Sequence, residues 1–392
     1  MTARNGGEAS AASVGRPIAQ RPRLMFLYWG RRGVMSRFTL ELGRAVRAHP
    51  SMHATISVSR QNELFADLEQ LAPDLFPIDT FRAGRGAALE AWRIPGLRRR
   101  LVERLRQDGI EAVIDLLPHV WSPLVAPAIV AAGVRYVPLI HDADLHPGDP
   151  TAWVMAFANR CVRTADVVLT LSHAVADRLV ARRMVPRAKL ATLFLPDLHY
   201  GPPAVRAPPR QGEPLRLAFF GRIMPYKGLL MFVETMERLR AAGVNVQVGV
   251  FGEGALGACA GRLEQIGAEV VNRWLGEEEV GRILSGYHAL VLSHIEASQS
   301  AVAATAFGLG LPVVATPVGG LGEQIADGHT GIVAKRADAQ ALADAVMRLV
   351  EPQTYARISR TIAANKDQRS MRRFAEACAM NALRPCHIAS AA

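Results

Sequence analysis

Residues 215–242 read LRLAFFGRIMPYKGLLMFVETMERLRAA. The apolar run over 215–221 predicts a buried β-strand, and the stretch over 229–242 predicts a helix. The loop between them contains glycine, proline and two cations, Arg222 and Lys227. A strand that leads through a loop into a helix is the repeating unit of a doubly wound α/β sheet, in which ligands bind at the carboxyl ends of the strands.

The same alternation extends along the chain on both sides of this stretch. In the first half the pattern predicts strands over 24–29, 54–59, 111–117, 135–142 and 166–172, and helices over 37–47, 122–132 and 173–182. Beyond residue 242 it predicts strands over 244–251, 268–274, 289–293 and 312–318, and helices over 256–267, 277–285 and 299–308. Strands that alternate with helices predict parallel sheets covered on both faces.

Length and composition divide the chain into two domains. A chain of 392 residues is long for one core, and residues 198–214 hold five prolines and two glycines, which is typical of a linker. We therefore expect a flexible tail over 1–20 and two Rossmann-like domains over 21–200 and 215–365, joined by a linker over 201–214 and facing a central cleft. We also expect a helical segment over 366–392 at the end of the chain. One possible arrangement is that this segment crosses back to the N-terminal domain.

The charge balance restricts the ligands. The formal net charge is +11, which attracts phosphorylated ligands, nucleic acid or anionic lipid. Aromatic residues make up only 6%, and no nucleic-acid recognition motif is present, so nucleic acid is disfavoured. No secretory signal or convincing membrane span is seen, and the four cysteines form no CxxC pair. A cytoplasmic protein without metal or redox chemistry is the resulting expectation.

The loop of the opening stretch suits a diphosphate. A helix that begins near Gly228 presents free N–H groups and a partial positive charge at its first turn. Arg222 adds a bidentate fork and Lys227 a compact point charge. The alternative interpretation is a solvated turn with two surface cations.

Four strings together resemble glycosyltransferase family 4. They are Gly221-Arg222-x4-Lys227-Gly228, residues 293–296, residues 312–323 and residues 327–331, in the order expected for that family. The resemblance is strong over 215–350 and looser in the first half. It implies the GT-B fold, an N-terminal acceptor-side domain, and a C-terminal domain that binds a nucleoside-diphosphate sugar. It also implies retaining transfer that needs neither a further cofactor nor a metal.

The resemblance also implies roles for individual residues. Arg222 and Lys227 would bind the diphosphate and stabilise the leaving nucleotide, Glu296 would contact the transferred sugar, and His119 would contact it near the reacting carbon. The last two residues also have structural alternatives: Glu296 as a neighbour of a helix N-cap or a solvated acid, and His119 as a structural histidine. The predicted donor-binding backbone positions are Gly30, Gly33, Gly221, Ser300, Ala301 and Val302.

One departure from the family pattern concerns the nucleotide ribose. The family usually has a second Glu eight residues after the first, but position 304 is Ala, Thr305 follows, and no carboxylate lies between Glu296 and Glu323. The ribose contact is therefore changed, lost or supplied elsewhere.

The acceptor side is less clearly marked. His141 and Asp142 open a polar segment over 141–148 that follows a predicted strand, so they are expected to line the acceptor pocket; a plain polar loop is the alternative. The segment 91–107 is rich in arginine, with Leu97, Leu101 and Leu105 on one face. Such a helix is a surface helix on the sheet, a site for anionic membranes, or both at once.

The predicted function is transfer of a sugar from a nucleoside-diphosphate sugar to the hydroxyl of a glycan or lipid-linked acceptor, in polysaccharide or glycolipid biosynthesis. The protein would be cytoplasmic or peripheral on the inner face of the membrane. Two alternatives stay open: a nucleotide-sugar epimerase of the same fold, and a non-catalytic nucleotide-sugar-binding protein.

Overall fold

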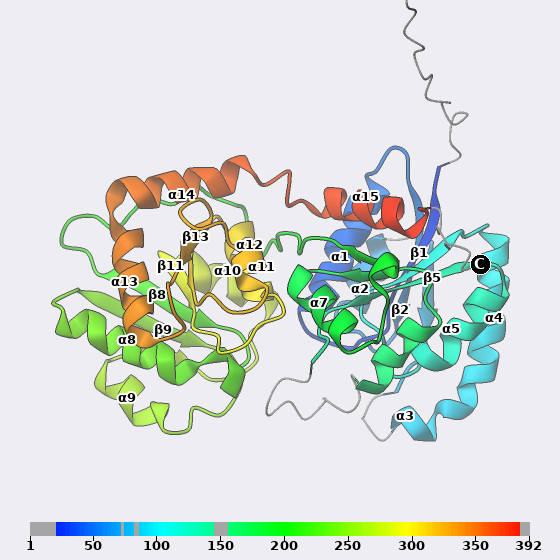
Figure 1. Cartoon of the computed structure of the whole chain (residues 1–392), viewed down its shortest axis with the longest axis horizontal. Helices are drawn as coiled ribbons and strands as arrows, with labels where there is room; N and C mark the ends of the chain where they lie inside the picture. The colour runs from blue at the N-terminus through cyan, green and yellow to red at the C-terminus, as the bar shows by residue number, and fades with distance from the viewer. Residues whose placement is uncertain (1–20, 72–73, 82–85, 145–155, 385–392) are drawn as a thin grey trace, which may run out of the picture.

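Two parallel sheets form the protein (Figure 1). The computed structural model describes residues 21–71, 74–81, 86–144 and 156–384. The N-terminal sheet has seven strands in the order β3-β2-β1-β4-β5-β6-β7, and the C-terminal sheet has six in the order β10-β9-β8-β11-β12-β13. Both orders reverse beside the first strand, as in doubly wound folds. The predicted tail over 1–20 and the end of the chain over 385–392 lie outside the described residues.

The N-terminal domain contains the first half of these elements. Its strands are β1 Arg23–Tyr28, β2 His53–Ser59, β3 Leu75–Ile78, β4 Ala112–Asp115, β5 Arg135–Ile140, β6 Val168–Thr170 and β7 Leu190–Thr192. Its helices are α1 Val34–Arg47, α2 Phe65–Leu71, α3 Gly86–Leu89, α4 Ile94–Gln107, α5 Ser122–Ala131 and α7 His173–Ala181.

The C-terminal domain continues with the same alternation. Its strands are β8 Leu215–Phe220, β9 Val246–Phe251, β10 Glu269–Val271, β11 Ala289–Leu292, β12 Val313–Ala315 and β13 Gly331–Val333. Its helices are α8 Leu229–Ala241, α9 Cys259–Gln265, α10 Glu277–Ser285, α11 Ala301–Gly308, α12 Leu321–Gln324, α13 Ala339–Val350 and α14 Pro352–Ala364. The last helix, α15 Met371–Ala382, returns to the N-terminal domain (Figure 1).

Strand β1 shows why the N-terminal sheet is covered on both faces. Met25 and Leu27 pack into one core with α4 and α5, whereas Leu24 and Phe26 pack into another with α1 and α15. Alternate side chains of a strand point to opposite faces, so a continuous apolar run needs a layer of helices on each. On the second face the rings of Phe38 in α1 and Phe374 in α15 meet edge to face, with 5.1 Å between their centroids.

Three strands were not predicted: β3, β7 and β13. All three lie at the edge of a sheet and have only three or four residues. Strand β3 also contains Pro77, which cannot donate to a sheet ladder and is tolerated here because β3 is an edge strand.

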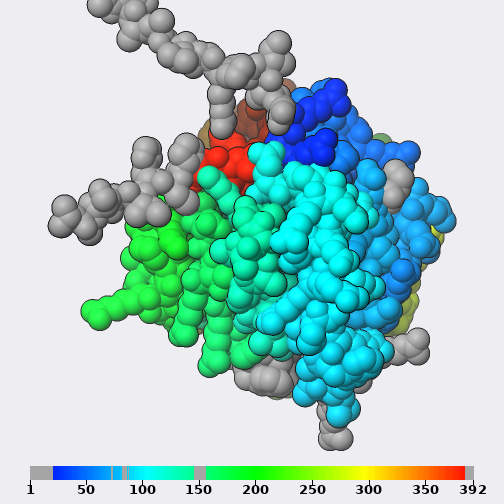
Figure 2. Space-filling model, turned by 90° about the vertical axis from the view of Figure 1, so that its right-hand side faces the viewer, coloured from blue at the N-terminus to red at the C-terminus, as the bar shows by residue number. Residues whose placement is uncertain are grey.

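The arginine-rich helix α4 is a sheet-covering helix. Its side chains Ile94, Leu97, Leu101 and Leu105 are buried, as the surface-helix interpretation expects. Figure 2 shows α4 in cyan on the side of the N-terminal domain that faces away from the C-terminal domain. In the part of the chain that the structure describes, no helix is both long and apolar enough to cross a bilayer.

Candidate active site between the two sheets

The loop after β8 has a backbone that only glycine allows at two points. Gly221 has φ 101° and Gly228 has φ 67°, both in the left-handed region. A Cβ atom on Gly228 would lie 2.0 Å from the carbonyl oxygen of Ser293, so the loop packs directly on the backbone that follows β11. A 3-10 turn over Pro225–Lys227 lies between the two glycines, and α8 begins at Leu229.

Lys227 folds back over the start of this loop. A Cβ atom on Gly221 would lie 2.9 Å from Lys227 Nζ and 3.2 Å from Val302 Cγ2. Burial, together with the nearby charge of Arg222, lowers the pKa of Lys227 from 10.5 to about 8. Removal from water disfavours the ammonium form and a second cation disfavours it further, so an anion bound here would relieve both effects.

The loop that carries Glu296 is attached to the Lys227 loop. The Ser293 hydroxyl donates to the carbonyl oxygen of Lys227 at 3.0 Å, and the Ile295 N–H donates to that of Tyr226 at 2.7 Å. Glu296 itself is exposed to solvent. The structure thus brings together three of the predicted site residues, Arg222, Lys227 and Glu296, at the carboxyl ends of β8 and β11.

The start of α11 lies beside Lys227 and is only partly available to a ligand. The Ser300 N–H donates to Gln324 Oε1 at 2.9 Å, and Gln324 Nε2 donates back to the Ser300 carbonyl at 2.9 Å. Ala301 and Val302 are the first helical residues, whose N–H groups have no acceptor within the helix. The amide of Ser300, one of the three predicted phosphate contacts, is therefore already used within the protein, and the contacts of Ala301 and Val302 stay predictions.

His119 stands in an aromatic box at the end of β4. Its ring centroid is 6.0 Å from that of Trp29, 5.2 Å from Phe81 and 5.5 Å from Trp121. Burial, reinforced by the charge of Arg31, lowers the pKa of His119 to about 3, so the ring is neutral. Its Nδ1 accepts the N–H of Trp121 at 3.2 Å, which puts the proton on Nε2, where it can be donated to a ligand hydroxyl.

A buried network missed in the sequence positions the His119 loop. The Ser122 hydroxyl accepts the His119 N–H at 2.9 Å and donates to Asp115 Oδ2 at 2.6 Å; the Tyr136 hydroxyl donates to the same oxygen at 2.7 Å. Burial raises the pKa of Asp115 to about 6. The sequence offers one signal of this network: Asp115 is an acidic residue within the apolar run of a predicted strand.

The glycine turn after β1 is held by the next loop of the sheet. Asn62 Nδ2 donates to the Gly30 carbonyl at 2.9 Å, and the Gly33 N–H donates to Glu63 Oε1 at 2.7 Å. The amide of Gly33, which was predicted to contact the nucleotide sugar, therefore already has a hydrogen-bond partner within the protein.

His141 forms a contact between the two domains. Its Nε2 lies 2.8 Å from the Leu116 carbonyl oxygen and its Nδ1 lies 3.5 Å from Gln299 Nε2. Burial lowers the pKa of His141, and both ring nitrogens have partners. The carbonyl of Asp142 accepts from Asn159 Nδ2 at 3.0 Å. The remainder of the predicted acceptor segment, from residue 145 on, lies outside the described residues.

Glu323 joins the domains a second time. Its two carboxylate oxygens accept the N–H groups of His173 and Ala174 at 2.6 and 2.8 Å, and so cap the N-terminus of α7. The Ser172 hydroxyl donates to the Ser298 carbonyl at 2.8 Å. These residues follow β6, β11 and β12, so the carboxyl ends of the two sheets face each other.

No acid stands where the family's second Glu is expected. Ala304 is fully buried, and Thr305 is buried with its hydroxyl donating to the Ala301 carbonyl at 2.9 Å. Among the described residues there is also no group of three or more His, Cys, Asp or Glu side chains that could hold a metal ion.

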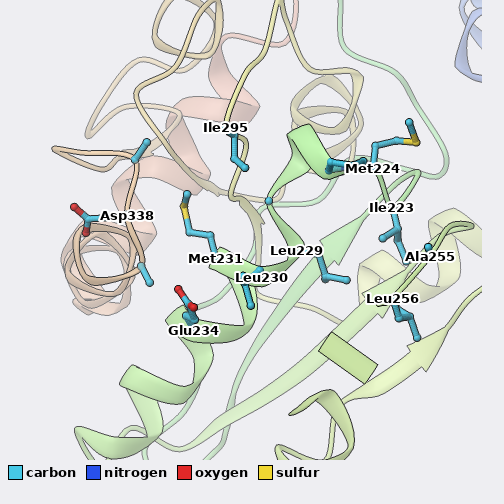
Figure 3. Close-up of a pocket in the computed structure, with 14 residues that line it drawn as sticks. Ile223, Met224, Leu229, Leu230, Met231, Glu234, Ala255, Leu256, Ile295 and Asp338 are labelled. Carbon is cyan, nitrogen blue, oxygen red and sulfur yellow. The ribbon is translucent and has the colours of Figure 1, made fainter. Parts of the chain in front are cut away.

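A mainly apolar pocket of about 590 Å³ lies beside the Lys227 loop (Figure 3). Ile223, Leu229 and Ile295 contribute to its lining, and its two acidic side chains are Glu234 and Asp338. Two carboxylates make it unsuitable for a phosphate, and neither Arg222 nor Lys227 lines it.

Comparison with known proteins agrees with this architecture. Residues 214–352 match the family model described as glycosyl transferases group 1. The chain is similar to the D-inositol 3-phosphate glycosyltransferase of Acidothermus cellulolyticus, with 28% identity over 361 residues that cover 81% of this chain and 74% of that protein. The solved structure of Anabaena HepE in complex with UDP and glucose is also similar, with a TM-score of 0.66 and 15% identity over 90% of this chain and 98% of that one.

A UDP-N-acetylglucosamine 2-epimerase structure is similar to a lesser degree, with a TM-score of 0.53 and 13% identity over 91% of this chain and 95% of that one. At such identities structural likeness shows the fold alone. The two facing Rossmann-like sheets have the GT-B fold, and residues 214–352 match the sequence pattern of glycosyl transferases group 1.

Proposed function

We propose that this protein is a glycosyltransferase that moves a sugar from a nucleoside-diphosphate sugar to an acceptor hydroxyl. One observation carries the proposal: Lys227 folds back onto Gly221 in a loop whose backbone is hydrogen-bonded to the Glu296 loop. This arrangement puts two cations and a carboxylate at adjoining strand ends. The group 1 family match and the glycosyltransferase relative support the same activity.

The diphosphate of the donor would be bound by Arg222, Lys227 and the first N–H groups of α11. Negative charge grows on the leaving diphosphate as the glycosidic bond breaks, and fixed cations stabilise that charge more than they stabilise the ground state. Since the Lys227 ammonium is already partly desolvated, its interaction with the diphosphate is strong.

The sugar would lie between the two sheets. Glu296 would accept hydrogen bonds from its hydroxyls on one side, and neutral His119 would donate from Nε2 on the other. For the transfer itself we propose retention, with acceptor and leaving diphosphate on the same face of the sugar. The departing diphosphate oxygen takes the proton of the acceptor hydroxyl, so no side-chain base is required. Closure of the two domains would limit hydrolysis by excluding water.

The two alternative functions predict different outcomes for the nucleotide sugar. An epimerase of this fold would convert the nucleotide sugar with no acceptor present. A non-catalytic protein, having lost the ribose-binding Glu, would bind the nucleotide sugar without consuming it. Transfer is favoured because the family match covers the donor-binding region.

The test is a thermal-shift screen of nucleotide sugars on the full chain, since a ligand that binds only the folded state raises the melting temperature. Wild type should be stabilised by at least one nucleotide sugar, and Arg222→Ala should lose most of that shift. Product analysis with the stabilising donor, with and without acceptor, then separates the three functions. A wild-type protein that no nucleotide sugar stabilises would refute the proposal.

A further inference from the structure

A second cluster of cations lies on the N-terminal side, at the carboxyl ends of β1 and β2. Arg31, Arg32, Arg60, Gln61 and Glu63 line an open pocket of about 580 Å³. Three guanidinium groups and one carboxylate leave the lining with a net charge of +2. A concave surface with one dominant sign of charge concentrates ligands of the opposite sign.

Aromatic rings hold the three guanidinium groups. The Cζ atom of Arg31 lies 5.8 Å from the centroid of the Phe81 ring, and that of Arg60 lies 5.6 Å from Phe65. The third group, Arg32, stacks at 5.5 Å on Trp274 of the other domain. Stacking on a ring leaves the edge of a guanidinium group, with its N–H donors, open to a ligand.

Among the residues that the structure describes, these arginines have no anionic partner. Within the described ranges, none of the three guanidinium groups donates a hydrogen bond or forms an ion pair, in contrast to Arg37, which binds Glu41 and Glu277. The carboxylate in the lining, Glu63, already accepts the Gly33 N–H at 2.7 Å.

The pocket adjoins the proposed point of transfer. Phe81 lies under Arg31 and also packs on His119, with 5.2 Å between the two ring centroids. The leaving diphosphate has its own cations, Arg222 and Lys227, in the other domain. A second set beside His119 is therefore available to a different anion, on the side where the acceptor must enter.

We infer that Arg31, Arg32 and Arg60 bind a phosphate group carried by the acceptor. The inference rests on the proposed function, because it assigns the acceptor to this side of the transfer site. Guanidinium groups match the oxygen geometry of phosphate and bind it through paired N–H donors. The phosphate could belong to a small phosphorylated sugar or polyol, or to the headgroup of a lipid.

The test is titration calorimetry with inorganic phosphate on the full chain. It is done in an Arg222→Ala/Lys227→Ala background, which removes the donor-loop cations as a competing site. Adding Arg31→Gln/Arg60→Gln should weaken phosphate binding roughly 10- to 100-fold, the usual effect of losing hydrogen bonds to a charged group. Adding Arg99→Gln/Arg100→Gln instead, an equal charge change on α4, should leave it unchanged.

Equal phosphate affinity in the Arg31/Arg60 and Arg99/Arg100 variants would overturn the inference, and so would absence of phosphate binding in the parent background. Stabilisation of wild type by nucleotide sugars is a separate measurement, so the proposed function can survive either result. If phosphate binds as expected, glycerol 3-phosphate and vesicles containing phosphatidic acid identify the source. Binding of glycerol 3-phosphate indicates a soluble acceptor. Vesicle binding alone indicates a lipid if it falls in Arg31→Gln/Arg60→Gln and not in Arg99→Gln/Arg100→Gln.

Discussion

Donor binding should depend on pH through Lys227. The free protein holds this ammonium with a pKa of about 8, because burial and Arg222 disfavour its charge. A bound diphosphate favours the charged form, so the pKa rises on binding. By linkage, the full affinity is present below about pH 8 and is lost as the pH rises above it.

The size of the effect follows from the two protonation states. If the bound diphosphate restores the ordinary pKa of 10.5, the free protein at pH 9 has about one tenth of its Lys227 charged while the complex keeps it. The dissociation constant for the donor should therefore be roughly tenfold higher at pH 9 than at pH 7.

The assay is titration calorimetry of wild type and Lys227→Arg with the nucleotide sugar that best stabilises the protein. Arginine stays charged throughout this range, so the variant should bind with little difference between pH 7 and pH 9. Comparison with Lys227→Arg also corrects for any titration of the ligand or of other residues. A wild-type dissociation constant that does not change with pH, or a variant that loses affinity just as steeply, would refute the argument from burial of Lys227.

Three further outcomes are expected. Arg222→Ala should lower the rate of transfer by about 10²–10³, the usual effect of removing a donor to developing charge, with an unchanged melting temperature; unaltered turnover would contradict the diphosphate assignment. Glu296→Gln should lower kcat more than Glu323→Gln, which should instead cost about 0.5–1 kcal/mol of stability as a weaker cap of α7; the reverse order in kinetics would show the two roles to be exchanged. Peripheral membrane binding through α4 should appear as salt-sensitive sedimentation with anionic but not neutral vesicles and should fall in Arg99→Gln/Arg100→Gln; equal, negligible binding to both vesicle types at low salt would exclude it.

Arg99 and Arg100 are replaced in the vesicle test because two other arginines of α4 have close partners within the domain. Of the α4 arginines, Arg98 donates to the Leu124 carbonyl at 2.6 Å and Arg104 pairs with Asp108 at 2.5 Å. Replacing either would disturb the packing of the domain as well as its surface charge. Arg99 and Arg100 are exposed and so change mainly the charge.

The sequence by itself determined the doubly wound class and the donor loop of this protein. Both depend on local patterns: short apolar runs that alternate with helical segments, and glycines flanking Arg222 and Lys227 directly after a strand. Such patterns can be read because a strand end and the helix that follows it are adjacent in the chain. Short edge elements such as β3 were missed, since Pro77 and four residues do not make a recognisable pattern.

Only the tertiary structure decided which loops of the two sheets contact each other. Glu323 follows β12, yet it caps α7 about 150 residues away. The two ring nitrogens of His141 have Leu116 and Gln299 as hydrogen-bond partners. Arg31 and Arg60 lie in separate loops and converge only because β1 and β2 are neighbours in the sheet. Long-range pairs of this kind depend on strand order and domain docking, which no local spacing encodes.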